Sequence, residues 1–157
     1  MGDAATLLVV HHTVSPALQE LLEAVLSGTK AEGLESIEVI VRPALSAGVP
    51  DVLAADGFLL GTPVNIGYLS GAMKYFFDNV YYPCLEAKVG APYGLYVHGN
   101  SDAAGAVRAA ESITNGMGWR RVHEPVVITG GVTKDASEAC WDPVSYTHLT
   151  LPTKRIV

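Results

Sequence analysis

The stretch from Asp56 to Asp78 constrains the fold of this chain more than any other part of the sequence. It begins with a short apolar run that ends at Gly61 and continues through a loop rich in Gly, Pro and Asn. From Ser70 onward, apolar residues recur at helical spacing, which predicts a strand, an open loop and an amphipathic helix. The loop at the carboxyl end of a strand in an α/β sheet is a common ligand site. This loop offers backbone groups rather than charged side chains, which favours a flat, neutral ligand with polar edges.

Four further apolar runs resemble this strand, and helical patterns separate them. The predicted strands are residues 6–12, 37–41, 57–61, 93–98 and 122–128, all rich in Val, Leu, Ile or Tyr. Strands that alternate with helices imply right-handed crossovers and a mainly parallel sheet covered on both faces. We therefore predict an α/β domain with a doubly wound, five-stranded parallel sheet in the order 2-1-3-4-5. In this order the loops after the first, third and fourth strands converge at one edge of the sheet.

The predicted helices carry their own start and stop signals. Ser15 followed by Pro16 is typical of a helix N-cap and first helical position. Ser101 or Asp102 opens a later helix, and the glycines at 116–118 end it. The hydroxyls of Thr13 and Ser15 precede the first helix, whose free N–H groups and dipole favour an anion.

Composition narrows the class of protein. A chain of 157 residues that is 49% hydrophobic and 17% charged is long and apolar enough for one domain with a core. The net charge of -6, without a cluster of Lys and Arg, argues against a nucleic-acid partner. Cys84 and Cys140 lie too far apart in sequence to suggest a disulfide framework or a zinc site, so a reducing cytoplasm is expected. The apolar run at residues 7–10 is too short for a signal peptide or a membrane span.

Several catalytic motifs are absent from the sequence. There is no G-x-S-x-G elbow, no G-x-x-x-x-G-K-[ST] loop, and no G-x-G-x-x-G after the first predicted strand. His11 and His12 are adjacent, and adjacent strand residues point to opposite faces, so at most one faces a ligand. We therefore predict no metal site and no nucleophilic side chain.

The pattern G-T-P-x-x-x-G-x-x-S-G-x-M-K-x-F-x-D at residues 61–78 resembles the flavin-contacting loop and helix of the flavodoxin-like reductases. It is most similar to the tryptophan-repressor-binding-protein family of FMN-dependent NAD(P)H:quinone reductases, and the similarity covers about residues 6–142. The resemblance implies a cytoplasmic FMN-binding oxidoreductase. Such an enzyme passes hydride equivalents from NAD(P)H, its co-substrate, to a quinone or similar small-molecule acceptor. A homo-oligomer is compatible with this assignment.

The resemblance also implies three groups of cofactor-binding residues. The FMN phosphate would be held by Thr13, Ser15, Ala17 and Leu18. Backbone groups of Pro63, Val64, Asn65, Ile66 and Gly67 would cradle the edge of the isoalloxazine ring. The third flavin loop would contain His98, Gly99 and Asn100. Two features depart from the family pattern: Pro16 stands where the family has a loop glycine and removes one N–H donor, and the third loop lacks the glycine run.

Two other functions fit the same residues. One is a flavodoxin-type electron carrier, for which a strongly acidic surface is expected. The 16 acidic residues against 10 basic ones favour the enzyme instead. The other is a flavodoxin-like domain without a cofactor. The loss of one N–H donor at Pro16 is compatible with this function.

The last 15 residues differ in character from the rest of the chain. Residues 143–157 show no clear helical or strand pattern, and Pro152 interrupts them. The string resembles translated adapter sequence, so we predict a domain of residues 1–142 with a truncated last helix and a non-native, poorly packed tail at 143–157. A native edge strand at residues 144–151 is the alternative.

Overall fold

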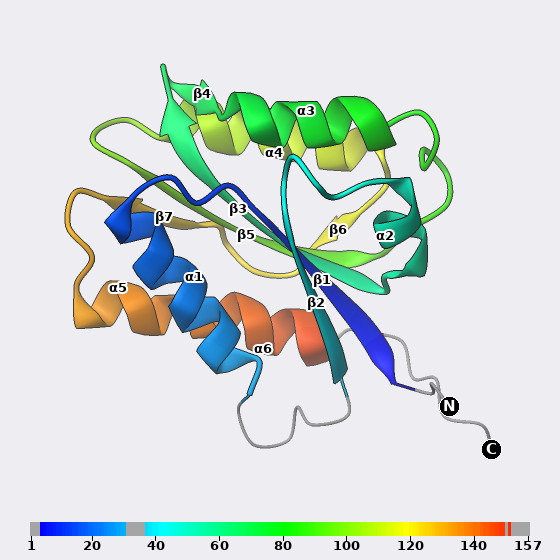
Figure 1. The fold of residues 1–157 in the computed structure, drawn as a ribbon, viewed down its shortest axis with the longest axis horizontal. Coiled ribbons are helices and arrows are strands. Elements are labelled where there is room, and N and C mark those ends of the chain that lie inside the picture. Colours follow the sequence, from blue (N-terminus) through cyan, green and yellow to red (C-terminus); the bar gives the residue numbers. More distant parts are fainter. Residues whose placement is uncertain (1–3, 31–36, 150, 152–157) are drawn as a thin grey trace.

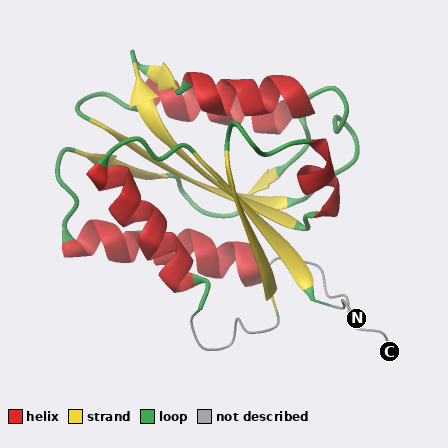
Figure 2. Ribbon diagram, viewed as in Figure 1, coloured by secondary structure: helices red, strands yellow, loops and turns green. Residues whose placement is uncertain are grey.

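A parallel sheet with helices on both faces forms the body of the molecule (Figure 1, Figure 2). The structure is a computed structural model that describes residues 4–30, 37–149 and 151. Its strands are β1 (Ala5–His11), β2 (Ile37–Pro43), β3 (Gly57–Asn65), β4 (Tyr68–Leu69), β5 (Pro92–Gly99), β6 (Arg120–Arg121) and β7 (Val126–Thr129). Its helices are α1 (Pro16–Gly28), α2 (Val49–Ala54), α3 (Gly71–Val80), α4 (Ala104–Gly116), α5 (Lys134–Ala139) and α6 (Trp141–Leu149).

The strand order confirms the predicted topology. The sheet runs β2-β1-β3-β5-β6, with β7 beside the carboxyl half of β5, and all these pairs are parallel. The register aligns His11, Gly61 and Tyr96 across the three central strands. Among the strands that the structure describes, only β4 is antiparallel, because it folds back on the end of β3. The carboxyl ends of β1, β3 and β5 therefore lie at one edge of the sheet.

Both faces of the central strands are buried, which explains their nearly continuous apolar sequences. On β1, Leu7 and Val9 belong to the core under α1, α5 and α6, whereas Leu8 and Val10 belong to the core under α2, α3 and α4. The longest helices, α1 and α4, have 13 residues each. No helix in the described part of the chain has the length and apolar character needed to cross a membrane.

The last predicted strand is wrong in detail. Instead of one strand at 122–128, two short strands form, β6 and β7, and residues 122–125 connect them. Pro125 has no N–H to donate to a ladder, which favours a break at this position. Figure 1 shows β6 and β7 at opposite ends of β5, so together they cover one side of that strand.

The chain beyond Asp142 also differs from its prediction. Residues 141–149 form α6 rather than an edge strand or an unstructured tail, and Val144 and Thr147 are fully buried. A Cβ atom on Gly57 would lie 2.5 Å from the side chain of Leu151, so this residue also packs against the sheet. The expectation of a poorly packed tail is therefore wrong for Val144, Thr147 and Leu151, whereas the truncation of the native last helix stays a prediction. The non-native origin of residues 143–157 remains a proposal about their sequence.

This packing predicts that removing the tail destabilises the domain. Truncation after Asp142 deletes Val144, and burial of a valine contributes roughly 1.5–3 kcal/mol. The thermal midpoint should fall by more than about 4 °C, the shift that roughly 1 kcal/mol produces in a domain of this size. Val144→Asp in the full chain should act in the same direction, whereas Asp142→Asn, at an exposed position of the same helix, is the matched control. An unchanged midpoint in the truncated chain would show that the tail contributes no packing energy.

Candidate functional site

Three loops meet at the carboxyl edge of the sheet. The first connects β1 to α1, the second is the turn between β3 and β4, and the third connects β5 to α4 (Figure 1). The sequence predicts this convergence, and the strand order that produces it is confirmed.

The first loop ends in a capped helix. Ser15 has extended backbone angles, and its Oγ accepts a hydrogen bond from the N–H of Leu18 at 3.2 Å, which confirms Ser15 as the N-cap. In the described part of the chain, the N–H groups of Thr13, Val14 and Ser15 have no hydrogen-bond acceptor. These donors, together with the positive end of the α1 dipole, make the loop suitable for an anion. Pro16 contributes no N–H.

A histidine orients one of the hydroxyls in this loop. Nδ1 of His11 lies 2.8 Å from Oγ1 of Thr13. Burial lowers the pKa of His11, and the neighbouring His12 lowers it further, so the imidazole is neutral at pH 7. A neutral His11 that donates from Nδ1 leaves the Thr13 hydroxyl free to donate to an anion. In this tautomer, His11 would orient the Thr13 hydroxyl toward a ligand.

The second loop is a two-residue β-hairpin with a strained turn. Asn65 pairs with Tyr68, and the two residues between them have positive φ, 52° at Ile66 and 70° at Gly67. Positive φ at both central positions defines a type I′ turn, in which Asn-Gly is the usual sequence. A β-branched residue there is rare and costs about 1–2 kcal/mol. Ile66 is nevertheless fully exposed at 104%, so its side chain gains nothing from the protein core.

A buried threonine closes the base of this hairpin. Oγ1 of Thr62 accepts a hydrogen bond from the N–H of Ser70 at 3.1 Å and donates to the carbonyl of Pro63 at 2.9 Å. Ser70 in turn caps α3, since its Oγ accepts from the N–H of Met73 at 3.1 Å. The hairpin therefore projects from a fixed base between β3 and α3.

Two glycines hold the hairpin against the third loop and α4. A Cβ atom on Gly99 would lie 2.8 Å from Cβ of Val64, and one on Gly105 would lie 2.0 Å from the carbonyl oxygen of Gly67. Any side chain at these positions would push the hairpin away. Gly67 itself has nothing within 4 Å of the place where its Cβ would be, so open space lies beside the turn.

A cavity of about 510 Å³ opens between the hairpin, the third loop and α4. Four residues predicted for the ring site line it: Val64, Ile66, Gly67 and Asn100. Four others were not predicted: Ser101, Asp102, Gly105 and Arg108. Of these, only Arg108 carries a positive charge. It lies in the second turn of a helix on an exposed face, where sequence alone gives no sign of a site.

Several predicted residues have structural roles as well. Nε2 of His98 lies 2.6 Å from the carbonyl oxygen of Gly130, to which it donates, so this side chain ties β5 to the loop after β7. The side chain of Leu18 is buried in the core under α1 at 1% exposure, so only its backbone faces the first loop. Pro63 and Gly99 are buried at the base of the site, whereas Asn65 and Asn100 are exposed.

The described residues offer neither a cluster of metal ligands nor an exposed thiol. The described residues contain no group of three or more His, Cys, Asp or Glu side chains that could hold a metal ion. Cys84 and Cys140 are buried free thiols, and burial raises the pKa of both, to about 11 for Cys140. Both cysteines are therefore poor nucleophiles at neutral pH.

The donor set fits FMN. The N–H groups of Thr13 and Ser15 have no acceptor, and together with the two hydroxyl groups they can donate to a phosphate. The open turn at Ile66 and Gly67 suits the edge of a flat ring. These two loops and Asn100 come from neighbouring strands, so one elongated ligand can reach all three. The absence of charged side chains from the turn matches a neutral ring system.

Comparison with known proteins agrees with this geometry. Residues 32–134, which are about two thirds of the chain, match the family of NADPH-dependent FMN reductases. A flavodoxin of Aquifex aeolicus (strain VF5) is 40% identical over 73 residues, which are 46% of this chain and 38% of that flavodoxin. The match thus spans little more than a third of the curated relative.

Solved structures show the same fold at low sequence identity. Flavodoxin 1 from Bacillus cereus superposes with a TM-score of 0.78 at 16% identity, covering 94% of this chain and 100% of that one. The flavodoxin of Streptococcus pneumoniae TIGR4 gives 0.77 at 17% identity, with coverage of 94% and 100%. A WrbA-like flavodoxin from Agrobacterium tumefaciens gives 0.74 at 17% identity, with coverage of 93% and 97%.

These findings confirm the predicted flavodoxin-like fold and, at the level of the family, the predicted use of FMN and NADPH. The family match covers more than half of the chain and includes the hairpin, the third loop and α4. The chain therefore belongs to the NADPH-dependent FMN reductase family.

Proposed function

We propose that this protein binds FMN across its three carboxyl-edge loops and passes hydride equivalents from NAD(P)H to a quinone or similar small acceptor. The observation that carries the proposal is the strained, uncharged hairpin at Ile66 and Gly67, which opens on a cavity beside Asn100. Backbone strain that the core does not require is typical of functional sites. Membership of the NADPH-dependent FMN reductase family supports the same reading.

Each loop has a distinct task in this proposal. Thr13, Ser15 and the N–H of Ala17 would hold the phosphate, and backbone groups from Val64 to Gly67 would contact the ring edge. Asn100 would approach the ring from the third loop. FMN supplies the redox chemistry, because its ring accepts a hydride and transfers the electrons onward. The chain's own residues bind and orient the ring, and none has to act as a nucleophile.

A flavodoxin-type electron carrier is the second candidate. The flavodoxin of Aquifex aeolicus and the flavodoxins of similar fold favour it. A carrier would bind FMN equally well but would not oxidise NAD(P)H by itself. The reductase is the stronger candidate because the matching family is NADPH-dependent, and the charge balance of 10 basic to 16 acidic residues is only moderately acidic.

Titration with FMN tests the proposal and separates its alternatives. FMN should bind the purified protein with quenched fluorescence and a shifted absorbance spectrum, and riboflavin, which lacks the phosphate, should bind more weakly. The loaded protein should then oxidise NADPH or NADH in the presence of a quinone. Binding without NAD(P)H oxidation would indicate the carrier. Failure of FMN to bind would indicate a domain that functions without a cofactor.

Two substitutions in the hairpin distinguish the effect of backbone strain on stability from the effect of the hairpin on FMN affinity. Ile66→Asn should raise the free energy of unfolding by about 1 kcal/mol, because Asn tolerates positive φ. Gly67→Val should lower it, because a β-branched residue at positive φ is strained. Gly67→Val should weaken FMN binding if the backbone of the hairpin contacts the ring, whereas Ile66→Asn, which keeps the turn conformation, should retain it. Measurements of FMN affinity and of chemical denaturation on the same variants give both values, and unchanged affinity in Gly67→Val would remove the hairpin from the site.

A further inference from the structure

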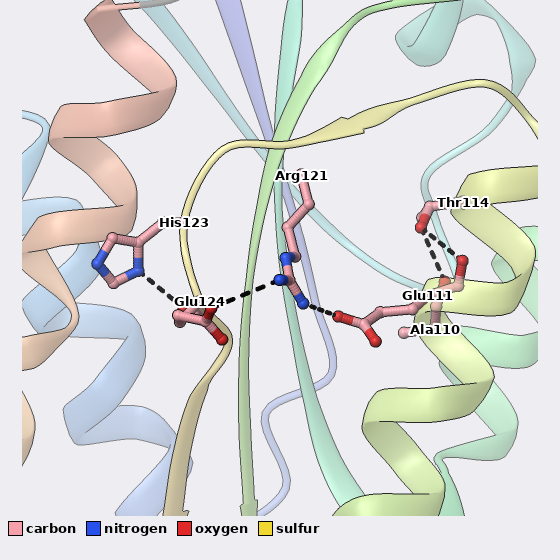
Figure 3. A network of polar contacts seen from close by, with 6 residues as sticks. All are labelled: Ala110, Glu111, Thr114, Arg121, His123 and Glu124. Atoms are coloured by element: carbon pink, nitrogen blue, oxygen red, sulfur yellow. Dashed lines mark hydrogen bonds and ion pairs between the residues drawn. The ribbon is translucent and has the colours of Figure 1, made fainter.

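Arg108 is a cation without an ion-pair partner beside the proposed ring site. Within the described part of the chain, no carboxylate lies within ion-pair distance of its guanidinium. The acid nearest to it on the same helix is Glu111, one turn further along α4. Arg121 of β6 binds the carboxylate of Glu111 and also lies 3.6 Å from Glu124 (Figure 3). This network neutralises Glu111, so the positive charge of Arg108 is available to a ligand.

Arg108 lies between two cavities of similar size. One is the cavity of about 510 Å³ beside the hairpin. The other, also about 510 Å³, lies between α4 and β7, where apolar side chains of Ala104, Val107 and Val127 form much of its wall. Both cavities include Arg108 and Asp102. The carboxylate of Asp102 accepts a hydrogen bond from the N–H of Ala104 at 2.9 Å. One of its oxygens is therefore already bonded to the first turn of α4.

We propose that these two cavities form one groove for the nicotinamide dinucleotide, with Arg108 binding its pyrophosphate. The inference rests on the proposed function. A dinucleotide has two nucleoside halves joined by an anionic centre, and the groove has two chambers joined at a cation. The chamber beside Ile66 and Gly67 takes the nicotinamide half, next to the proposed ring site. The chamber beside Val107 and Val127 takes the adenosine half.

The chemistry of each chamber matches its half of the ligand. Val127 is 45% exposed on a face that α4 leaves uncovered, so a flat adenine ring would bury apolar surface there. An arginine can bind two phosphate oxygens at once, which suits a pyrophosphate. Each chamber falls within the usual range of small-molecule sites, roughly 300–1,000 Å³. Arg108 therefore becomes the residue that sets affinity for the reductant without contacting the flavin.

Direct binding of ADP to the FMN-loaded protein tests this inference, because ADP carries only the adenosine and the pyrophosphate. Isothermal titration calorimetry should show ADP binding in competition with NADPH and without release of FMN. Arg108→Ala should weaken ADP binding about tenfold, the range expected for loss of a charge-assisted hydrogen bond. Arg108→Lys should retain part of the affinity. Arg120→Ala, which removes an exposed arginine with the same change in net charge, should leave the affinity unchanged.

A second variant tests the adenosine chamber. Val127→Asp should weaken binding of ADP and NADPH, and it should spare reduced nicotinamide mononucleotide, which lacks the adenosine half. Equal loss for NADPH and NADH in Arg108→Ala supports a pyrophosphate contact. A loss confined to NADPH would place the 2′-phosphate at Arg108 and overturn the proposed orientation.

Failure of this inference is distinct from failure of the proposed function. If the protein binds FMN and oxidises NADPH, but Arg108→Ala and Arg120→Ala have equal effects on ADP affinity, the groove is not the dinucleotide site. If FMN does not bind at all, the proposed function fails first. The thermal midpoint of Arg108→Ala should equal that of the parent protein, which serves as the check on folding.

Discussion

Burial of both faces of β1, β3 and β5 is the constraint on which the rest of the structure depends. These strands carry apolar side chains to two separate cores, so helices must cover the sheet on both sides. Parallel strands covered in this way require crossover connections that return every strand in the same direction. The loops that leave β1, β3 and β5 therefore meet at one edge, and the site follows from the topology.

The geometry at that edge is set by backbone packing more than by side-chain chemistry. Gly99 admits Val64, and Gly105 admits the carbonyl of Gly67, so the hairpin lies against the third loop and α4 at contact distance. Thr62 fixes the other end of the hairpin through its hydrogen bond to Ser70. A turn held at both ends can keep an unfavourable conformation at Ile66. The turn itself carries no charged side chain, and the cavity beside it contains the charged side chains of Asp102 and Arg108.

Much of this architecture could be predicted from the sequence, because the central strands and the capped helices are strongly patterned. The strand order, the Ser15 cap, the start of a helix at Ser70 and the convergence of three loops all follow from local signals. The hairpin was harder to predict, since Ile66 stands where Asn usually marks a type I′ turn. The α6 helix could not be predicted because its sequence carries no apolar stripe, yet Val144 lies against Gly28 of α1 and Thr147 against Gly57 and Gly94 of the sheet. Arg108 could not be predicted because its availability depends on an ion pair between other residues that only the folded chain brings together.

Amide hydrogen exchange with and without FMN tests the central claim most directly, because it reports on each loop separately. FMN should protect amides in residues 13–17, 64–67 and 98–100, which belong to the three carboxyl-edge loops. The cavity between α1 and α5, lined by Glu20, Lys134 and Trp141 among others, should exchange at an unchanged rate. Protection confined to that remote cavity, or none at the three loops under saturating FMN, would contradict the account.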